Sequence, residues 1–122
     1  MTVPALPTVS SRTATLPGSD GALAIYEAAP AEASSALVIL HEAFGVTDHI
    51  ADVVRRAADA GYHTVAPDLF HRSGGGVAPY GDLQAAANYF SSLTDNGVLA
   101  DADACLSHLT ALGFAPERIG IV

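Results

Sequence analysis

Apolar residues along the chain follow two kinds of pattern, and each predicts a different element. Residues 36–40 are an unbroken apolar run, which is typical of a strand covered on both faces and so of a parallel sheet. Over residues 48–60 apolar positions recur every three or four residues, which predicts a helix. Thr47 or the residue after it can cap this helix, and Gly61 can end it. Residues 62–66 are the next β-prone run.

The second half of the chain predicts two more helices and a final strand. A loop rich in glycine covers residues 71–81, and a helix is expected over residues 82–93. Its predicted inward positions are Leu83, Ala86, Ala87 and Phe90. A third helix is expected between residues 96–97 and Leu112, with an apolar stripe of Val98, Ala102, Cys105, Leu109 and Leu112. The last apolar run, residues 118–122, reads as a buried strand.

The amino-terminal part predicts a leader followed by a hairpin. Residues 1–12 contain two prolines and several Ser and Thr, so we expect a flexible leader. Residues 13–16 and 22–29 can pair around the turn formers of residues 17–21. Within the second strand, Leu23, Ile25 and Glu27 alternate with smaller or polar positions.

Strands that alternate with helices predict the α/β class. We expect a three-layer α/β/α sandwich with a mostly parallel sheet and an N-terminal antiparallel hairpin, formed by one domain over residues 13–122. In such sheets the binding crevice lies at the carboxyl ends of the strands. The residues just after Leu40, Ala66 and Val122 are therefore the candidates for a site.

Charge and composition exclude several functions. The chain of 122 residues has 13 acidic residues, five arginines and no lysine, a formal net charge of −8, so nucleic acid and anionic membranes are not expected partners. We find neither a basic segment followed by an apolar core at the amino terminus nor an apolar run long enough to span a membrane, and we expect a cytoplasmic protein. The single cysteine excludes an intramolecular disulfide.

The segment His41-Glu42-Ala43-Phe44-Gly45-Val46 follows a predicted buried strand and places ionisable groups at the expected crevice. Together with Gly61-Tyr62, Ala66-Pro67-Asp68-Leu69-Phe70 and Glu117-Arg118-Ile119-Gly120-Ile121-Val122, it resembles the dienelactone hydrolase family of the α/β-hydrolase fold. Order and spacing match from about Leu16 to Val122. The resemblance implies a partial α/β-hydrolase fold and hydrolysis of a small carboxylic ester or lactone, without a cofactor.

The resemblance also implies roles for particular residues. In the family, the strand matching residues 119–122 leads into a Gly-x-Cys-x-Gly elbow whose cysteine attacks the carbonyl carbon. Later Asp and His residues complete the triad, so residues 13–122 correspond to the amino-terminal half of the domain and are expected to be inactive alone. Glu42 matches the glutamate that controls the nucleophile, and the backbone N–H of Ala43 matches an oxyanion donor. Arg72 and Phe44 are the expected substrate-binding residues. The chain has no arginine or lysine between Ser73 and Arg118, so the resemblance does not extend to specificity for dienelactone itself.

Each of these residues also has a structural interpretation. Glu42 can be a carboxylate satisfied by local N–H groups, and His41 a hydrogen-bonded core histidine. Asp68 is expected to brace the loop that follows it. Arg72 can likewise brace this loop rather than bind a substrate carboxylate.

Three other features do not predict a site. Cys105 lies in the apolar stripe of a helix, so we expect an unreactive core thiol. The run Ser73-Gly74-Gly75-Gly76 lacks the Lys that completes a phosphate-binding loop. The histidines at positions 49, 63 and 108 do not have the spacing of a metal site, so no metal is predicted.

Two alternatives to a cysteine hydrolase stay open. The chain can be a non-catalytic α/β module that binds a small ligand or a partner, or part of a serine esterase or peptidase of the same superfold. A Gly-x-Cys or Gly-x-Ser elbow after Val122 would separate these cases. The strand at residues 118–122 is central in the complete superfold, so in this chain we expect it to be an exposed edge that can mediate association. The oligomeric state and the substrate are not predicted.

Overall fold

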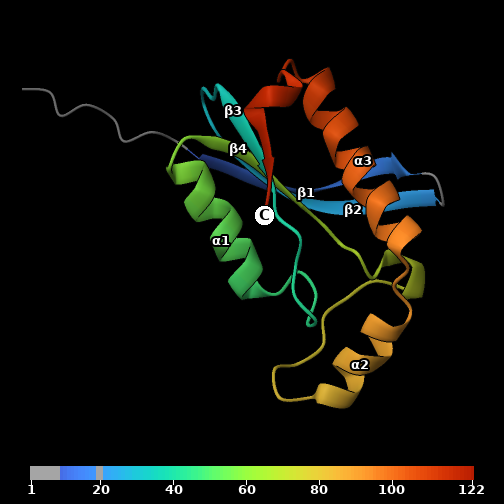
Figure 1. Cartoon of the computed structure of the whole chain (residues 1–122). Helices are drawn as coiled ribbons and strands as arrows, with labels where there is room; N and C mark the ends of the chain where they lie inside the picture. Colours follow the sequence, from blue (N-terminus) through green and yellow to red (C-terminus); the bar gives the residue numbers. More distant parts are fainter. Residues whose placement is uncertain (1–8, 19–20) are drawn as a thin grey trace, which may run out of the picture.

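The computed structural model describes residues 9–18 and 21–122. Its centre is a five-stranded sheet in the order β1-β2-β4-β3-β5 (Figure 1). The strands are β1 (Val9–Gly18), β2 (Gly21–Pro30), β3 (Ser35–Val38), β4 (Tyr62–Pro67) and β5 (Ile119–Ile121). Among the described residues, none of the helices is long and apolar enough to cross a membrane.

The amino-terminal hairpin extends further than the sequence pattern indicates. Strands β1 and β2 pair antiparallel from Val9↔Pro30 to Gly18↔Gly21, so residues 9–12 of the expected leader belong to a strand. The polar residues of β1 take part in this ladder along the whole length of β2. A composition typical of a flexible leader therefore did not indicate that these residues form a strand. The remaining leader residues, 1–8, and residues 19–20 of the turn lie outside the described residues.

The other strands supply the parallel part of the sheet. Strand β3 lies between β4 and β5 and is parallel to both, whereas β2 pairs antiparallel with β4. The sheet is therefore mixed, and its parallel character is confined to β3, β4 and β5. Strand β5 lies at its edge, as expected.

Two helices cover opposite faces of the sheet, which confirms the three-layer sandwich (Figure 1). Neighbouring residues of one strand point to opposite faces, so Val65 packs toward α3 (Asp95–Ala111) and Ala66 toward α1 (Asp48–Asp59). The α3 side includes Leu23, Ile25, Val38, Cys105 and Leu109. The α1 side includes Ala28, Ile39, Ile50, Val54 and Ala58.

Caps decide where these two helices begin. Thr47 caps α1, as one of the two expected residues, by accepting a hydrogen bond from the Ile50 N–H. Thr94 caps α3 by accepting from the Gly97 N–H, so α3 begins earlier than predicted. Its apolar stripe is confirmed at Cys105 and Leu109, but Leu112 is exposed because it follows the last residue of the helix.

The remaining helix, α2 (Leu83–Ser91), has a different inward face from the predicted one. Ala86 is buried as expected, but Leu83, Ala87 and Phe90 are exposed. Tyr89 determines the rotation of this helix, because its ring stacks on Phe70 with centroids 4.8 Å apart. Its hydroxyl also donates a 3.3 Å hydrogen bond to the Gly75 carbonyl oxygen. Helix α2 lies at the end of the sandwich rather than against the sheet (Figure 1).

Candidate functional site

The carboxyl ends of the parallel strands meet beside the segment 41–46, as the crevice rule predicts. The Val122 N–H donates to the Val38 carbonyl oxygen at 2.9 Å, and the Leu40 N–H donates to the Val122 carbonyl oxygen at 2.9 Å. The backbone that leaves β5 is therefore directly beside the backbone that leaves β3.

His41 is buried, with hydrogen bonds at both ring nitrogens. The Leu69 N–H donates to Nε2 at 2.9 Å, so Nε2 is unprotonated and the proton is on Nδ1. Nδ1–H then donates to the Glu42 carbonyl oxygen at 2.6 Å. The ring edge also packs on Phe70, with centroids 4.7 Å apart. These contacts support the structural interpretation of His41, as a neutral group that joins β3 to the loop after β4.

The backbone N–H of Ala43 has no acceptor among the described residues. The Glu42 carbonyl oxygen, which belongs to the same peptide unit as this N–H, accepts from His41 and, at 3.3 Å, from the Gly45 N–H. In a trans peptide the C=O and the N–H point in opposite directions, so this anchoring also fixes the direction of the Ala43 N–H. It is an oriented donor available to a ligand.

Gly45 allows the loop to turn sharply after this donor. Its φ of 91° is in the left-handed region, and a Cβ atom there would lie 2.6 Å from the Gly76 carbonyl oxygen. The Phe44 carbonyl oxygen accepts from the Ala78 N–H at 2.9 Å, and the Phe44 ring packs against Tyr80 with centroids 4.9 Å apart. The segment 41–46 and the loop 71–81 therefore hold each other in place.

The Glu42 side chain is exposed, and among the described residues it has no hydrogen-bond donor. The local N–H groups that a structural carboxylate would use therefore do not donate to it. The Glu42 carboxylate lies on the same loop as the Ala43 N–H.

Asp68 braces the loop that follows β4, as its structural interpretation predicts. One carboxylate oxygen accepts from the Phe70 N–H at 2.9 Å, and the other accepts from the Gly76 N–H at 3.4 Å. The loop then begins with a 3-10 turn at His71–Ser73.

Arg72 forms a bidentate ion pair with Asp101, which the sequence analysis did not predict. Its Nη1 and Nη2 atoms each donate at 3.0 Å to a different oxygen of Asp101, whose side chain is 3% exposed. His71 Nε2 is also 3.0 Å from an Asp101 oxygen. Arg72 lines a cavity of about 260 Å³ that Glu42, Ala43 and Phe44 do not line. Arg72 therefore does not share a cavity with the loop that carries Glu42, Ala43 and Phe44.

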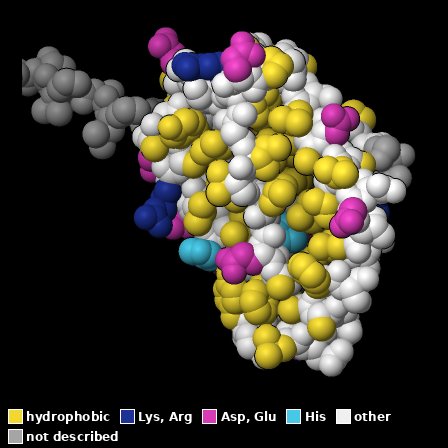
Figure 2. Space-filling view, in the orientation of Figure 1, with side chains coloured by type: hydrophobic (Ala, Val, Ile, Leu, Met, Phe, Trp, Pro, Cys, Tyr) yellow, Lys and Arg dark blue, Asp and Glu magenta, His cyan; other side chains and the backbone are white. Residues whose placement is uncertain are grey.

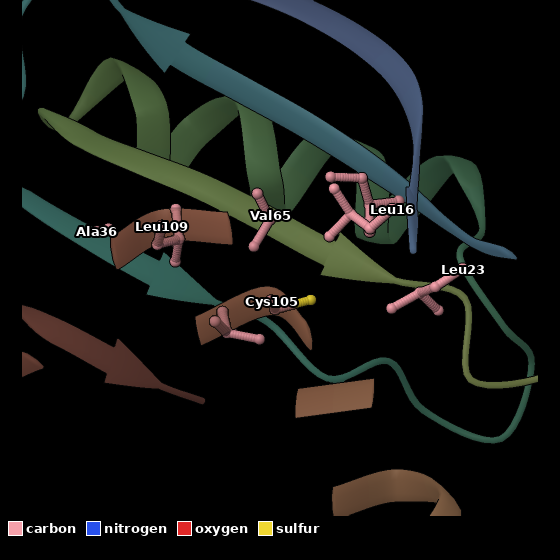
Figure 3. Close-up of a cluster of buried hydrophobic side chains, with 8 residues drawn as sticks. Leu16, Leu23, Ala36, Val65, Cys105 and Leu109 are labelled. Carbon is pink, nitrogen blue, oxygen red and sulfur yellow. The ribbon is translucent and has the colours of Figure 1, made fainter. Parts of the chain in front are cut away.

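Cys105 is a core residue, as expected. It is fully buried among apolar side chains from the sheet and from α3 (Figure 3). Burial raises the pKa of its thiol to about 12, and the negative charges of Asp101 and Glu27 act in the same direction. This thiol is not a nucleophile in the folded protein.

A second buried carboxylate, that of Glu27, contacts side chains that are far from it in the sequence. The spacing of the histidines along the chain did not predict these contacts. His63 Nε2 and His108 Nε2 lie 2.8 Å and 2.7 Å from the Glu27 Oε2 atom. Arg12 donates to Oε1 through Nε at 2.9 Å. Burial raises the pKa of Glu27, but the hydrogen bonds from His63, His108 and Arg12 outweigh it and lower the pKa to about 2. The alternation of Leu23, Ile25 and Glu27 was the only sequence signal for this burial.

Comparison with known proteins gives a consistent result. Residues 23–122 match the dienelactone hydrolase family. A Methylorubrum extorquens protein named "Putative carboxymethylenebutenolidase" is 35% identical over 109 residues, which is 87% of this chain and 38% of that protein. A protein of the same name from Escherichia coli K12 is 30% identical over 110 residues, 87% of this chain and 40% of that protein.

Among solved structures, a crystal structure titled as a putative dienelactone hydrolase from Klebsiella pneumoniae is similar, with a TM-score of 0.80 and 29% identity. The match covers 93% of this chain and 49% of that one. The chain therefore spans less than half the length of these relatives.

Proposed function

The chain belongs to the dienelactone hydrolase family, and we propose that it is the amino-terminal part of an enzyme that hydrolyses small carboxylic esters or lactones. The observation that carries the proposal is the position of β5. The Leu40 N–H donates to the Val122 carbonyl oxygen, so chain continuing from β5 would begin beside Glu42 and Ala43. The nucleophile elbow of this family follows the matching strand, and the aspartate and histidine of the triad come later still.

In the proposed reaction, Ala43 acts through its backbone. The nucleophile attacks the carbonyl carbon, and negative charge develops on the carbonyl oxygen. The oriented Ala43 N–H donates to this oxygen, together with the N–H of the residue after the nucleophile. Loss of one such donor lowers turnover by roughly a hundred- to a thousand-fold in well-studied hydrolases.

Glu42 is proposed to control the ionisation of the nucleophile. Its exposed carboxylate has no described donor and is one residue before the oxyanion donor, which suits a group that contacts a residue emerging from β5. Phe44 is proposed to contact the substrate beside it. Arg72, which pairs with Asp101, is also proposed to contact a substrate carboxylate.

The proposal is tested with the full-length protein and a simple aryl ester. Ala43→Pro removes the N–H, whereas the matched Ala43→Ser variant keeps it and changes only the side chain. We expect kcat to fall by about a hundred-fold or more in the first variant and little in the second. Circular dichroism verifies that both are folded. Equal activity in the two variants would contradict the role of Ala43.

Thiol-blocking reagents address the nucleophile. Inhibition of the full-length protein would support a cysteine, provided that it persists in a Cys105→Ala background. Hydrolysis that resists these reagents would instead support a serine at the elbow. If no ester or lactone is hydrolysed by the folded full-length protein, a non-catalytic ligand-binding module is the better interpretation.

A further inference from the structure

We propose that Glu27, His63 and His108 form a binding site for one divalent transition-metal ion, for which Zn²⁺ is the best fit. The site is separate from the candidate functional site, because His63 lies at the amino end of β4 and the candidate functional site follows the carboxyl end. The proposal does not depend on the hydrolase activity.

The donor set has the composition of a zinc site. Two imidazole nitrogens and one carboxylate oxygen are ligands that Zn²⁺ takes in proteins, and three protein ligands leave a fourth position open. The three ligand atoms lie within 4.8 Å of one another. They come from three elements, β2, β4 and α3, which are fixed relative to each other by the sheet and by the core beneath α3. The site is therefore assembled by the fold and not by one mobile loop.

The distances require an adjustment of side chains: each Nε2 has to move away from Oε2, and the two Nε2 atoms, which lie within 4.8 Å of each other, have to reach a similar spacing. Both Nε2 atoms are at hydrogen-bond distance from Oε2, 2.8 Å for His63 and 2.7 Å for His108. Neighbouring ligand atoms around tetrahedral Zn²⁺ are about 3.3 to 3.5 Å apart, given bonds of about 2.0 to 2.2 Å. Each histidine would thus retreat from Oε2 by about half an ångström as the ion enters.

The ring protons of His63 and His108 can be arranged so that both residues bind the metal. An ionised carboxylate only accepts hydrogen bonds, so each Nε2 carries a proton while the site holds no ion. On binding, each Nε2 loses its proton, which leaves the Nε2 lone pair to bind the metal while Nδ1 carries the ring proton.

An ion can reach the cluster from solvent. The side chains of His63 and His108 are 18% and 16% exposed, while that of Glu27 is 6% exposed. A cavity of about 290 Å³ borders the cluster and is lined in part by Arg12, Glu27 and His63. The cavity provides room for a water molecule or a small anion in the fourth coordination position.

Arg12 does not pair with Oε2, the carboxylate oxygen that is proposed to bind the metal. It pairs with Oε1, whereas both histidines contact Oε2, and its side chain is 65% exposed. It can remain as an outer partner that orients the carboxylate. Its positive charge reduces the affinity for a cation, so a site without Arg12 should bind Zn²⁺ more tightly provided the carboxylate keeps its orientation.

The test uses untagged protein that has been stripped with a chelator and then titrated with Zn²⁺ by calorimetry. We expect one equivalent to bind, and binding to weaken by at least about tenfold in His63→Gln and in His108→Gln. His49→Gln is the matched control, because His49 is an exposed histidine on α1. Its affinity should equal that of the unmodified protein.

Co²⁺ provides a second measurement on the unmodified protein, which decides the matter even if the variants do not fold. An intense visible absorption at one equivalent would support a four-coordinate site. The proposal is overturned if the unmodified protein shows no saturable binding, or if its affinity is the same in His63→Gln and His108→Gln. In either case Glu27, His63 and His108 form a hydrogen-bond network only.

Discussion

His41 sets the direction of the Ala43 N–H without contacting it. The Nδ1–H of His41 holds the Glu42 carbonyl oxygen at 2.6 Å, and that carbonyl belongs to the same rigid peptide unit as the Ala43 N–H. The tautomer that allows this is imposed by the Leu69 N–H, which donates to Nε2. His41, which follows β3, is thereby coupled to the loop after β4. We therefore regard His41 as a positioning residue for the proposed reaction.

Two substitutions separate the two hydrogen bonds of His41. Asparagine places an N–H near the position of Nδ1, whereas glutamine places an acceptor near the position of Nε2. In the full-length protein we expect His41→Gln to lower kcat more than His41→Asn, with KM for an aryl ester little changed. His41→Asn should instead lower the free energy of unfolding by about 1 to 3 kcal/mol, because the buried Leu69 N–H loses its acceptor. Steady-state kinetics and urea denaturation of both variants measure this. The same kcat in both would contradict a positioning role.

The ion pair of Arg72 and Asp101 should contribute to stability. Asp101 is 3% exposed, so Arg72→Ala leaves a buried carboxylate with His71 as its remaining described side-chain partner. We expect a loss of about 2 to 4 kcal/mol in the free energy of unfolding, and a smaller loss for Arg72→Lys, which keeps the charge but not the fork.

The lysine variant also tests the predicted substrate role of Arg72. If Arg72 binds a substrate carboxylate, Arg72→Lys should raise KM for an anionic ester and not for a neutral one. A purely structural role would leave the ratio of the two KM values unchanged.

Stability should decrease at alkaline pH because of Cys105. Its pKa is raised from 9.0 to about 12 in the folded protein, so the folded state disfavours the thiolate. This contribution is fully present below pH 9 and is lost as pH rises from 9 towards 12, by up to about 4 kcal/mol. Chemical denaturation between pH 8 and 10.5 should show a steeper loss for the unmodified protein than for Cys105→Ala. Parallel curves for the two proteins would contradict the shift.

The edge strand β5 should promote association of a polypeptide of residues 1–122. Ile121 and Val122 are 50% and 74% exposed on this edge, and hydrophobic side chains crowd the face around the carboxyl terminus in Figure 2. Ile121→Lys should reduce association, since a charge on an edge strand opposes pairing with another chain. Leu99→Lys, at an exposed apolar position of α3, is the control. Sedimentation at several concentrations measures this, and an unmodified polypeptide that remains monomeric would contradict it.

The sequence by itself determined the order of elements and the class of fold. The periodicity of residues 48–60 predicted α1 with its Thr47 cap, and the apolar run at residues 36–40 predicted a strand covered on both faces. These features depend on neighbours close along the chain, where the periods of helix and strand act directly. The segment His41 to Val46 was likewise placed at the carboxyl end of a strand, because the crevice of a parallel sheet has a fixed location.

Only the tertiary structure decided which distant side chains meet. The inward face of α2 depends on Tyr89 stacking on Phe70, so Leu83 and Phe90 are exposed despite their apolar character. Asp101 is buried in an apolar stripe because Arg72 reaches it from another element. Glu27 and His108 are 81 positions apart, yet their side chains are in contact. Such pairings depend on how the sheet and helices pack together. They cannot be predicted from the spacing of residues along the chain.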